Sequence, residues 1–599
     1  MALKYSDNYN NIMKSFLKYT LATIVGIIIS TILLFVFLII IIAASSQEKP
    51  VEVKDNTILV MKLNEQIVER TIDNPFDYLQ SGPFSMLRQT GLNDILDNIK
   101  KAKLDDNIAG IYMELTAIPA GIGTIEEIRN ALIDYKESGK FIICYSDIYT
   151  QKAYYLASVA DSIFLNPAGQ LTLMGFGAQV IFYKEALDKL DVEVQIIRHG
   201  TYKSAVEPFM LNEMSDENRE QTMAWVGTIW EHTLKGISNE RGIPVEKLNE
   251  YADGMTIKNA ELALEHGLID GIVYKDQVID ELKRKTGTEE KKNLRSINLR
   301  KYTKVPKIRE QKGWSKDKIA VIYAHGSILL GNMGEGFISS DRISKTIRNA
   351  RRDSTIKAIV LRINSGGGGS LASEVIRREV ELARQVKPVV ASFGDVAASG
   401  GYYIAAQADT ILSQPNTITG SIGVFALVPY TGKFFNKKLG INMDVAKTNQ
   451  HADMGSPFRP LTEDEKEVIR FGVEEVYDDF LQYVGEGRSM SHEEVDAIGQ
   501  GRVWSGINAI EKGLVDLHGG KADAVKIAAG MAGLEKFRIV ELPKLEDPFE
   551  QLLRELTENA RMRAIRKELG DQFKYYKQLQ ELGNMTGIQA RLPFMYEIN

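Results

Sequence analysis

Residues 358–408 have the sequence AIVLRINSGGGGSLASEVIRREVELARQVKPVVASFGDVAASGGYYIAAQA. The run Ala358–Ile363 is short and apolar, as a buried strand is, and Ser370–Gln385 then repeats apolar residues at helical spacing. Val389–Phe393 predicts a second strand, and Tyr402–Ala408 predicts a second helix. Strands that alternate with helices in this way indicate an α/β fold.

A run of glycines joins the first of these strands to the first helix. Residues 364–370 have the sequence NSGGGGS, and glycine lets backbone N–H groups approach a ligand closely. The start of a helix adds positive potential, which suits an oxyanion that develops during acyl transfer. A phosphate would be suited equally, but the Gly-Lys-Ser/Thr ending of a P-loop is missing. Taken alone, the run is also what a flexible turn contains.

A second glycine-containing turn presents a serine. Residues 394–402 have the sequence GDVAASGGY, so that Ser399 follows a strand and begins a helix. The small residues around Ser399 leave room for a substrate carbonyl, and the N–H of Gly400 can act as a second donor to an oxyanion. An N-cap serine without a chemical role would occupy the same kind of position.

Lys203 is the candidate base for this serine. It lies in GTYKSAVEPF, residues 200–209. A lysine acts as a base only when it is neutral, so its ordinary pKa of about 10.4 must fall to about 7–8. Burial among apolar groups lowers a lysine pKa by this much, and the neighbours Ala205, Val206 and Phe209 are compatible with burial. An exposed, solvated lysine is the ordinary alternative.

The chain also contains an internal duplication. Three pairs of segments recur in the same order at nearly the same offset, namely 154–161 with 402–409, 208–209 with 457–458, and 266–270 with 512–516. Gln151 occupies the position of Ser399 in the first repeat, and Ala452 occupies the position of Lys203 in the second. Residues 117–121, AIPAG, replace the glycine run. Each repeat lacks what the other keeps, which predicts one composite site within a single chain; a site shared between adjacent subunits is the alternative.

An apolar segment precedes the repeats. Residues 19–47 contain no charged residue, and residues 24–44 are almost continuously apolar. A bilayer span needs about 20 such residues, whereas the apolar part of a cleaved secretory signal has about 7–15. We therefore expect a retained transmembrane anchor, although the small residues 43–45 would also suit a cleavage site. Lys14 and Lys18 weakly favour a cytoplasmic N-terminus.

Composition and net charge argue against several classes of function. The 599 residues carry a net charge of −6, which does not suggest nucleic-acid binding. The single cysteine, Cys144, cannot form an intrachain disulfide, and its apolar neighbours predict a buried core residue rather than a nucleophile. We expect no metal, no cofactor and no nucleic-acid partner.

Three motifs together resemble the signal peptide peptidase A family, in its long form with two fused repeats. They are residues 202–209 (YKSAVEPF), 398–403 (ASGGYY) and 419–423 (TGSIG). The resemblance implies that Ser399 is the nucleophile, that Lys203 is the general base, and that Ser421 hydrogen-bonds the lysine. It covers nearly the whole chain, from the anchor to about residue 540.

We expect the oxyanion hole at Gly367, Gly368 and Gly400. One departure from the family concerns the turn before it, because Gly366 stands where the family usually has proline. This replacement predicts a looser turn.

The resemblance further implies a crotonase-like fold, shared with the proteolytic subunit of Clp protease, and a homo-oligomer that is typically a tetramer. The expected parts are 1–47 as cytoplasmic N-terminus and transmembrane anchor, 48–290 as the first crotonase-like repeat with the lysine, 291–317 as linker, 318–540 as the second repeat with the nucleophile and oxyanion hole, and 541–599 as a charged helical tail.

The predicted function is that of a membrane-bound serine endopeptidase with a Ser-Lys dyad. By resemblance it degrades cleaved signal peptides and other apolar peptides in the bacterial envelope, and lies in the inner membrane by a single span with its catalytic body on the periplasmic side. A Ser-His-Asp hydrolase would need a placed histidine, for which His451 and His325 are candidates. A crotonase-fold acyl-thioester enzyme and a non-catalytic membrane scaffold are also compatible with parts of the sequence.

Overall fold

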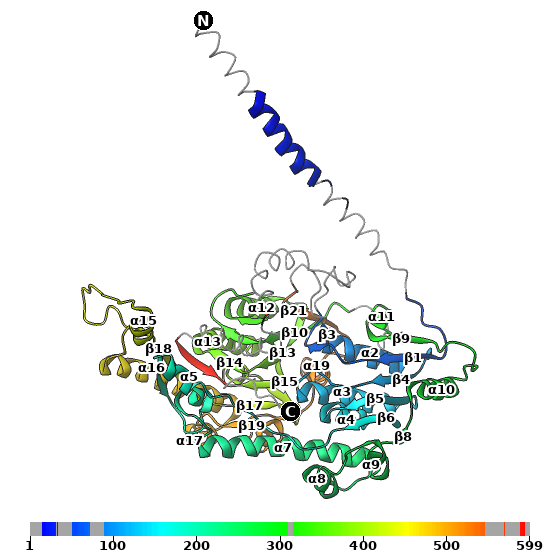
Figure 1. The fold of residues 1–599 in the computed structure, drawn as a ribbon. Coiled ribbons are helices and arrows are strands. Elements are labelled where there is room, and N and C mark those ends of the chain that lie inside the picture. Colours follow the sequence, from blue (N-terminus) through cyan, green and yellow to red (C-terminus); the bar gives the residue numbers. More distant parts are fainter. Residues whose placement is uncertain are drawn as a thin grey trace.

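The computed structural model describes residues 15–31, 33, 37, 51–71, 89–308, 315–334, 336–545, 568 and 587–592. Helices and parallel strands alternate along most of this length, so the expected α/β class is confirmed. Three large sheets organise the chain, and the third of them joins its two halves (Figure 1).

The first sheet belongs to the N-terminal half and has the strand order β8-β6-β5-β4-β1-β9. Its strands are β1 (Thr57–Met61), β4 (Ile108–Glu114), β5 (Phe141–Tyr149), β6 (Ser162–Leu171), β8 (Gly271–Ile272) and β9 (Ser296–Asn298). All of its pairings are parallel. The central strands are apolar over most of their length because helices cover the sheet and leave little of it to solvent.

The second sheet belongs to the C-terminal half and has the order β19-β17-β15-β13-β10-β21, with β16 beside β15 and β20 beside β16. Its strands are β10 (Lys318–His325), β13 (Ile356–Ser365), β15 (Val389–Ala398), β16 (Thr410–Ser413), β17 (Ile418–Gly420), β19 (Val503–Ser505), β20 (Leu517–His518) and β21 (Arg538–Leu542). The strands and the first helix predicted within 358–393 are therefore confirmed, because α13 spans Ser370–Arg384.

The helix predicted over Tyr402–Ala408 is wrong beyond its first residues. The helix α14 spans only Gly400–Tyr403. After it, the N–H groups of Ala405 and Ala408 bond to carbonyls three residues earlier, which tightens the chain into turns. These turns lead it directly into β16.

The third sheet is the one that links the halves, in the order β12-β11-β14-β22-β18-β7. Its strands are β7 (Glu193–Arg198), β11 (Ser327–Leu329), β12 (Phe337–Ser339), β14 (Gly367–Gly369), β18 (Phe425–Tyr430) and β22 (Ile588–Arg591). β7 of the first half pairs antiparallel with β18 of the second. The glycine run is thus a short strand, and a strand also occurs within the segment that we expected to be helical.

The remaining elements surround these sheets. They are β2 (Gln66–Val68), β3 (Gln89–Gly91), α2 (Leu92–Leu104), α3 (Ile122–Lys136), α4 (Gln151–Ala157), α5 (Lys184–Lys189), η1 (Ser204–Val206), α6 (Glu207–Met210), α7 (Asp216–Arg241), α8 (Val245–Asp253), α9 (Ala260–Glu265), α10 (Lys275–Thr286), α11 (Leu299–Thr303), α12 (Ser340–Arg352), α15 (Gly432–Leu439), α16 (Glu463–Arg488), α17 (His492–Ile498), α18 (Gly506–Glu511) and α19 (Lys521–Met531). The long helix α7 runs along one side of the molecule and contacts both halves (Figure 1).

Buried polar contacts fasten the two halves together. Arg362 of β13 forms ion pairs with Glu69 at 3.0 Å and Glu127 at 2.8 Å, and its side chain is fully buried. The carboxylate of Asp395 accepts hydrogen bonds from the backbone N–H and the hydroxyl of Thr124, both at 2.7 Å. A buried charge is stable only when it is paired, so these contacts fix how the halves sit.

The structure describes the expected linker and a part of the expected anchor. β9 and α11 lie within the stretch 291–317 that we expected to be a linker, and β9 pairs with β1. Residues 15–31 are helical, while most of the rest of the predicted span at 19–47 lies outside the described residues. Within the part of the chain that the structure describes, no helix has the length and apolar character needed to cross a bilayer.

Candidate functional site

Lys203 lies at the junction between the two halves. It precedes the short turn Ser204–Val206 and follows β7, whose pairing with β18 carries it to the second half. Its side chain is completely buried, and burial lowers the pKa of Lys203 well below its ordinary value. The lysine that we expected to be buried and neutral therefore has the environment that this role needs.

The side chain of Lys203 contacts the hydroxyl group of Ser399. Its Oγ lies 2.8 Å from Lys203 Nζ. Ser399 connects β15 to α14 with φ 53° and ψ −119°, a conformation that is strained for a residue with a side chain. Its N–H donates to the carbonyl of Gly420 at 2.8 Å, which helps to hold the strained turn. A strained strand-to-helix turn also holds the nucleophilic serine of α/β-hydrolases.

Ser421 is the third member of the cluster. Lys203 Nζ lies 3.0 Å from Ser421 Oγ and 3.3 Å from the carbonyl oxygen of Ser421. Ser421 also has a positive φ, 51°, and its N–H donates to the carbonyl of Arg502 at 2.7 Å. The structure therefore brings together all three residues that the sequence predicted, from three separate segments.

Two glycines that sequence reasoning missed hold Lys203 in place. A Cβ added at Gly501 would lie 2.6 Å from Lys203 N and 2.7 Å from Lys203 Cα. A Cβ added at Gly423 would lie 3.3 Å from Lys203 Cδ. Only glycine permits such an approach. The positive φ of Gly501, 80°, could not be inferred from its surroundings in the sequence, because the contact is with a residue of the other half.

The predicted oxyanion hole lies where β14 meets the start of α14. Gly367 has φ 97°, and its N–H donates to Ser365 Oγ at 3.1 Å, so this N–H is directed to a side chain. A Cβ added at Gly400 would lie 3.1 Å from Gly368 N. The backbone of Gly368 therefore packs closely against Gly400, the residue after Ser399, and a Cβ added at Gly367 would lie 2.7 Å from Gly400 N.

The position equivalent to Ser399 in the first repeat and the position equivalent to Lys203 in the second repeat lack these side chains. Gln151, which stands in place of Ser399, accepts hydrogen bonds from the N–H of Met174 at 2.7 Å and of Gly175 at 2.8 Å. Its amide also donates to the carbonyl of Gly175 at 2.8 Å. Gln151 thus binds backbone in its own half. Ala452, which stands in place of Lys203, is exposed.

The candidate histidines lie elsewhere. His451 pairs with Glu465 at 3.2 Å, and His325 is the exposed last residue of β10. Neither is a hydrogen-bond partner of Ser399, whose Oγ contacts Lys203 and, at 3.4 Å, the carbonyl of Gly423. Cys144 is buried as predicted, and burial raises the pKa of its thiol to about 12, which makes it a poor nucleophile.

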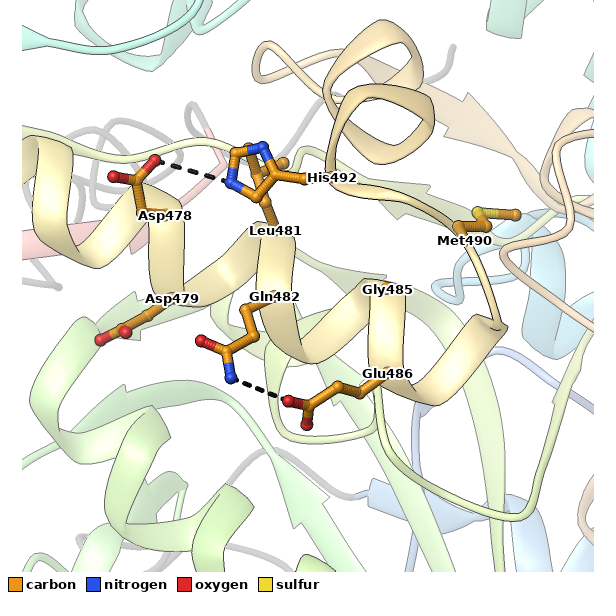
Figure 2. Close-up of a pocket in the computed structure, with 8 residues that line it drawn as sticks. All are labelled: Asp478, Asp479, Leu481, Gln482, Gly485, Glu486, Met490 and His492. Atoms are coloured by element: carbon orange, nitrogen blue, oxygen red, sulfur yellow. Dashed lines mark hydrogen bonds and ion pairs between the residues drawn. The ribbon is translucent and has the colours of Figure 1, made fainter.

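A separate surface hollow of about 490 Å³ lies along α16. Figure 2 shows that charged and polar side chains surround it, with His492 facing Asp478 at 3.7 Å and Gln482 donating to Glu486 at 2.8 Å. Leu481 and Met490 line it as well. The hollow contains none of the three clustered residues, and we assign it no chemistry.

Similarity to known proteins identifies the family of the chain. The sequence model described as "Peptidase family S49" matches residues 134–289 and again 381–535. The chain is 38% identical to "Protease 4" of Salmonella typhi over 76% of this chain and 74% of that protein. It is 34% identical to "Serine protease SPPA, chloroplastic" of Arabidopsis thaliana over 84% of this chain and 73% of that protein.

Among solved structures, a ClpP1 mutant from Listeria monocytogenes shares 17% identity with a TM-score of 0.23, covering 34% of this chain and 94% of that one. The family match occurs twice and extends over both halves that build the cluster. The chain therefore belongs to peptidase family S49, and it is a serine peptidase of the signal peptide peptidase type.

Proposed function

We propose that this serine peptidase uses Ser399 as its nucleophile and Lys203 as its general base. The observation that carries the proposal is the 2.8 Å contact between Ser399 Oγ and the amine of a completely buried lysine. Burial lowers the pKa of this amine well below its ordinary value, which favours the neutral form that can accept the hydroxyl proton. The two groups come from different halves, so the proposal also makes the site a composite of both.

The proposed reaction has two halves. Ser399 Oγ attacks the carbonyl carbon of a peptide bond while Lys203 Nζ takes the hydroxyl proton, and the lysine then gives this proton to the departing amine. Water next attacks the serine ester, and Lys203 again accepts the proton and returns it to Ser399 Oγ. One water is consumed, and the products are a carboxylate and an amine.

Two further groups have supporting roles in this proposal. Ser421 receives a hydrogen bond from the lysine at 3.0 Å and so aims the amine at Ser399. The N–H groups of Gly368 and Gly400 stabilise the oxyanion, because donors placed beforehand cost no reorganisation when charge develops. Gly367 is not a donor in this proposal, because its N–H bonds to Ser365 Oγ. Its lack of a side chain lets neighbouring backbone approach closely.

The fold family, the substrates, the membrane anchor and the oligomeric state are part of the same proposal. We assign both halves to the crotonase-like fold, with apolar peptides, including signal-peptide remnants, as substrates. Residues 19–47 provide a single inner-membrane anchor that leaves the catalytic body on the periplasmic side, supported by their lack of charge. A homotetramer is supported by large apolar side chains that α16 exposes, notably Val468 and Phe471.

Substitutions at the two central residues test the proposal. Ser399→Ala and Lys203→Arg should each lower peptide hydrolysis to background while the protein stays folded, because arginine does not deprotonate. Ser413→Ala and Lys387→Arg are matched controls, at a buried serine and a partly buried lysine outside the cluster. Labelling of wild-type protein, but not of Ser399→Ala, by a serine-reactive phosphonate probe would locate the nucleophile. Strong activity in folded Lys203→Arg would overturn the assignment of the base.

A further inference from the structure

Gln221 of α7 is a completely buried amide beside the segment that carries Lys203. Its Nε2 donates to the carbonyl oxygen of Tyr202 at 2.9 Å and to Ser204 Oγ at 3.1 Å. Tyr202 and Ser204 are the residues immediately before and after Lys203. One side chain therefore holds the chain on both sides of the lysine.

The oxygen of the same amide is bonded to the second half of the molecule. Gln221 Oε1 accepts the N–H of Val503 at 3.1 Å, and Val503 belongs to β19, which pairs with β17 just before Ser421. The carbonyl of the preceding residue, Arg502, accepts the N–H of Ser421 at 2.7 Å. Gln221 thus connects the Lys203 segment to the strand that supports Ser421.

These partners require both ends of a primary amide. The carbonyl of Tyr202 can only accept and the N–H of Val503 can only donate, so Nε2 must face the first and Oε1 the second. A side chain without polar atoms would leave these buried groups unpaired, which is costly away from water. An ionised carboxylate would place an oxygen against the carbonyl of Tyr202. A protonated carboxyl group has one donor and one acceptor, so it could keep the bonds to both.

We propose that Gln221 is a positioning residue of the peptidase, which aims the amine of Lys203 at Ser399; this inference rests on the proposed function. The 2.8 Å contact between Lys203 Nζ and Ser399 Oγ is made from a segment whose two neighbouring residues Gln221 holds. A displacement of about 1 Å between reacting groups costs about 100-fold in rate. Because all hydrogen bonds of Gln221 go to the chain itself, its loss should lower kcat and leave KM nearly unchanged.

Two methionine variants test this role by their effect on kcat. Gln221→Met keeps a similar volume, removes every hydrogen bond of the amide, and should lower kcat about 10- to 100-fold with little change in KM. Gln407→Met is the matched control, because Gln407 is also buried and its amide bonds to Arg377 at 2.5 Å and to Glu486 at 2.8 Å, neither of which belongs to the cluster. This control should melt at a lowered temperature and keep its kcat. Thermal melting checks that both variants fold.

A third variant has a pH signature that a merely structural role would not produce. In Gln221→Glu the protonated carboxyl group keeps the bonds of the amide, whereas ionisation breaks the bond to Tyr202. Burial raises the pKa of a carboxyl group, in documented cases to about 8–9. The kcat of Gln221→Glu divided by wild-type kcat at the same pH should therefore fall as pH rises through the pKa of the new carboxyl group. Taking this ratio removes the titration of Lys203, which both proteins share, and melting at each pH checks that the variant is folded.

Ser399→Ala, assayed in parallel, separates this inference from the proposed function. If Ser399→Ala retains activity, the proposed function fails and this inference fails with it. If Ser399→Ala is inactive while folded Gln221→Met keeps the kcat of Gln407→Met, the positioning role is overturned and the proposed function stands. A raised KM with unchanged kcat would also overturn the role. Where Gln221→Met does not fold, Gln221→Glu decides, because a kcat ratio that stays constant up to about pH 9.5 overturns the role.

Discussion

Replacing Gly501 by alanine should disable the site without touching a reacting group. The new Cβ would lie 2.6 Å from Lys203 N, 2.7 Å from Lys203 Cα and 2.7 Å from Lys203 Cβ. Backbone atoms cannot swing aside as a flexible side-chain end can, so the lysine must retreat by about 1 Å, and a misplacement of this size costs about 100-fold in rate. The 2.8 Å contact between Lys203 and Ser399 is the one that this retreat would break.

The substitution also places alanine at φ 80°, which costs about 1–2 kcal/mol of stability. Gly139→Ala is the matched control, because Gly139 has φ 75° and an added Cβ there would meet nothing within 4 Å. Both variants should melt at lowered temperatures, and Gly501→Ala at the lower of the two because of its backbone contacts, whereas only Gly501→Ala should lose about 100-fold in kcat with little change in KM. A folded Gly501→Ala with kcat close to that of Gly139→Ala would refute the idea that this glycine positions the lysine.

Four further outcomes follow from the buried contacts of the structure. Because burial lowers the pKa of Lys203, kcat/KM should rise with pH through that lowered pKa, and no such limb should appear in the residual rate of Lys203→Met. The Lys203→Met protein should also be more stable than wild type near pH 7. In wild type, the unfolded chain binds more protons at this lysine than the folded protein does between the lowered pKa and about 10.5, and this difference favours unfolding. An unchanged melting temperature would contradict this. Ser421→Ala should lower kcat roughly 10- to 100-fold, because Lys203 becomes charged as it takes the serine proton, and a hydrogen bond to a charged group contributes about 1.5–3 kcal/mol. An unaltered kcat would remove Ser421 from the mechanism. Arg362→Ala should destabilise the protein by about 3–5 kcal/mol, since it leaves Glu69 and Glu127 buried without their partner, measured by urea unfolding.

Local patterns were enough to predict two residues of the cluster, and the family resemblance added the third. Ser399 and Lys203 each lie in a short segment whose small and apolar neighbours are compatible with a buried turn, whereas Ser421 was predicted from the resemblance of residues 419–423. The complementary losses at Gln151 and Ala452 predicted that the halves share one site. The same periodicity predicted β13, α13 and β15 correctly. These features depend on residues close together in the sequence, which is why single-sequence reasoning reaches them.

Contacts between distant segments were beyond that reasoning. The glycine run was expected to be a loop, but it forms β14 because β11 and β22 offer strand edges on both sides. β22 lies in a segment whose charge and composition favour a helix, and tertiary pairing overrides that preference. Gly501 and Gly423 look like ordinary turn glycines until the lysine that packs on them is known.

The precision of the cluster depends on the junction between the halves rather than on either half alone. Lys203 reaches Ser399 through the pairing of β7 with β18, and Arg362 and Asp395 fix the same junction by buried contacts with Glu69, Glu127 and Thr124. A change at Arg362 should therefore lower kcat as well as stability, although Arg362 is not a hydrogen-bond partner of Ser399 or Lys203. A duplicated chain can lose one copy of each group. If the lysine of the first half is the base for the serine of the second half, a serine in the first half and a lysine in the second are not needed for the reaction.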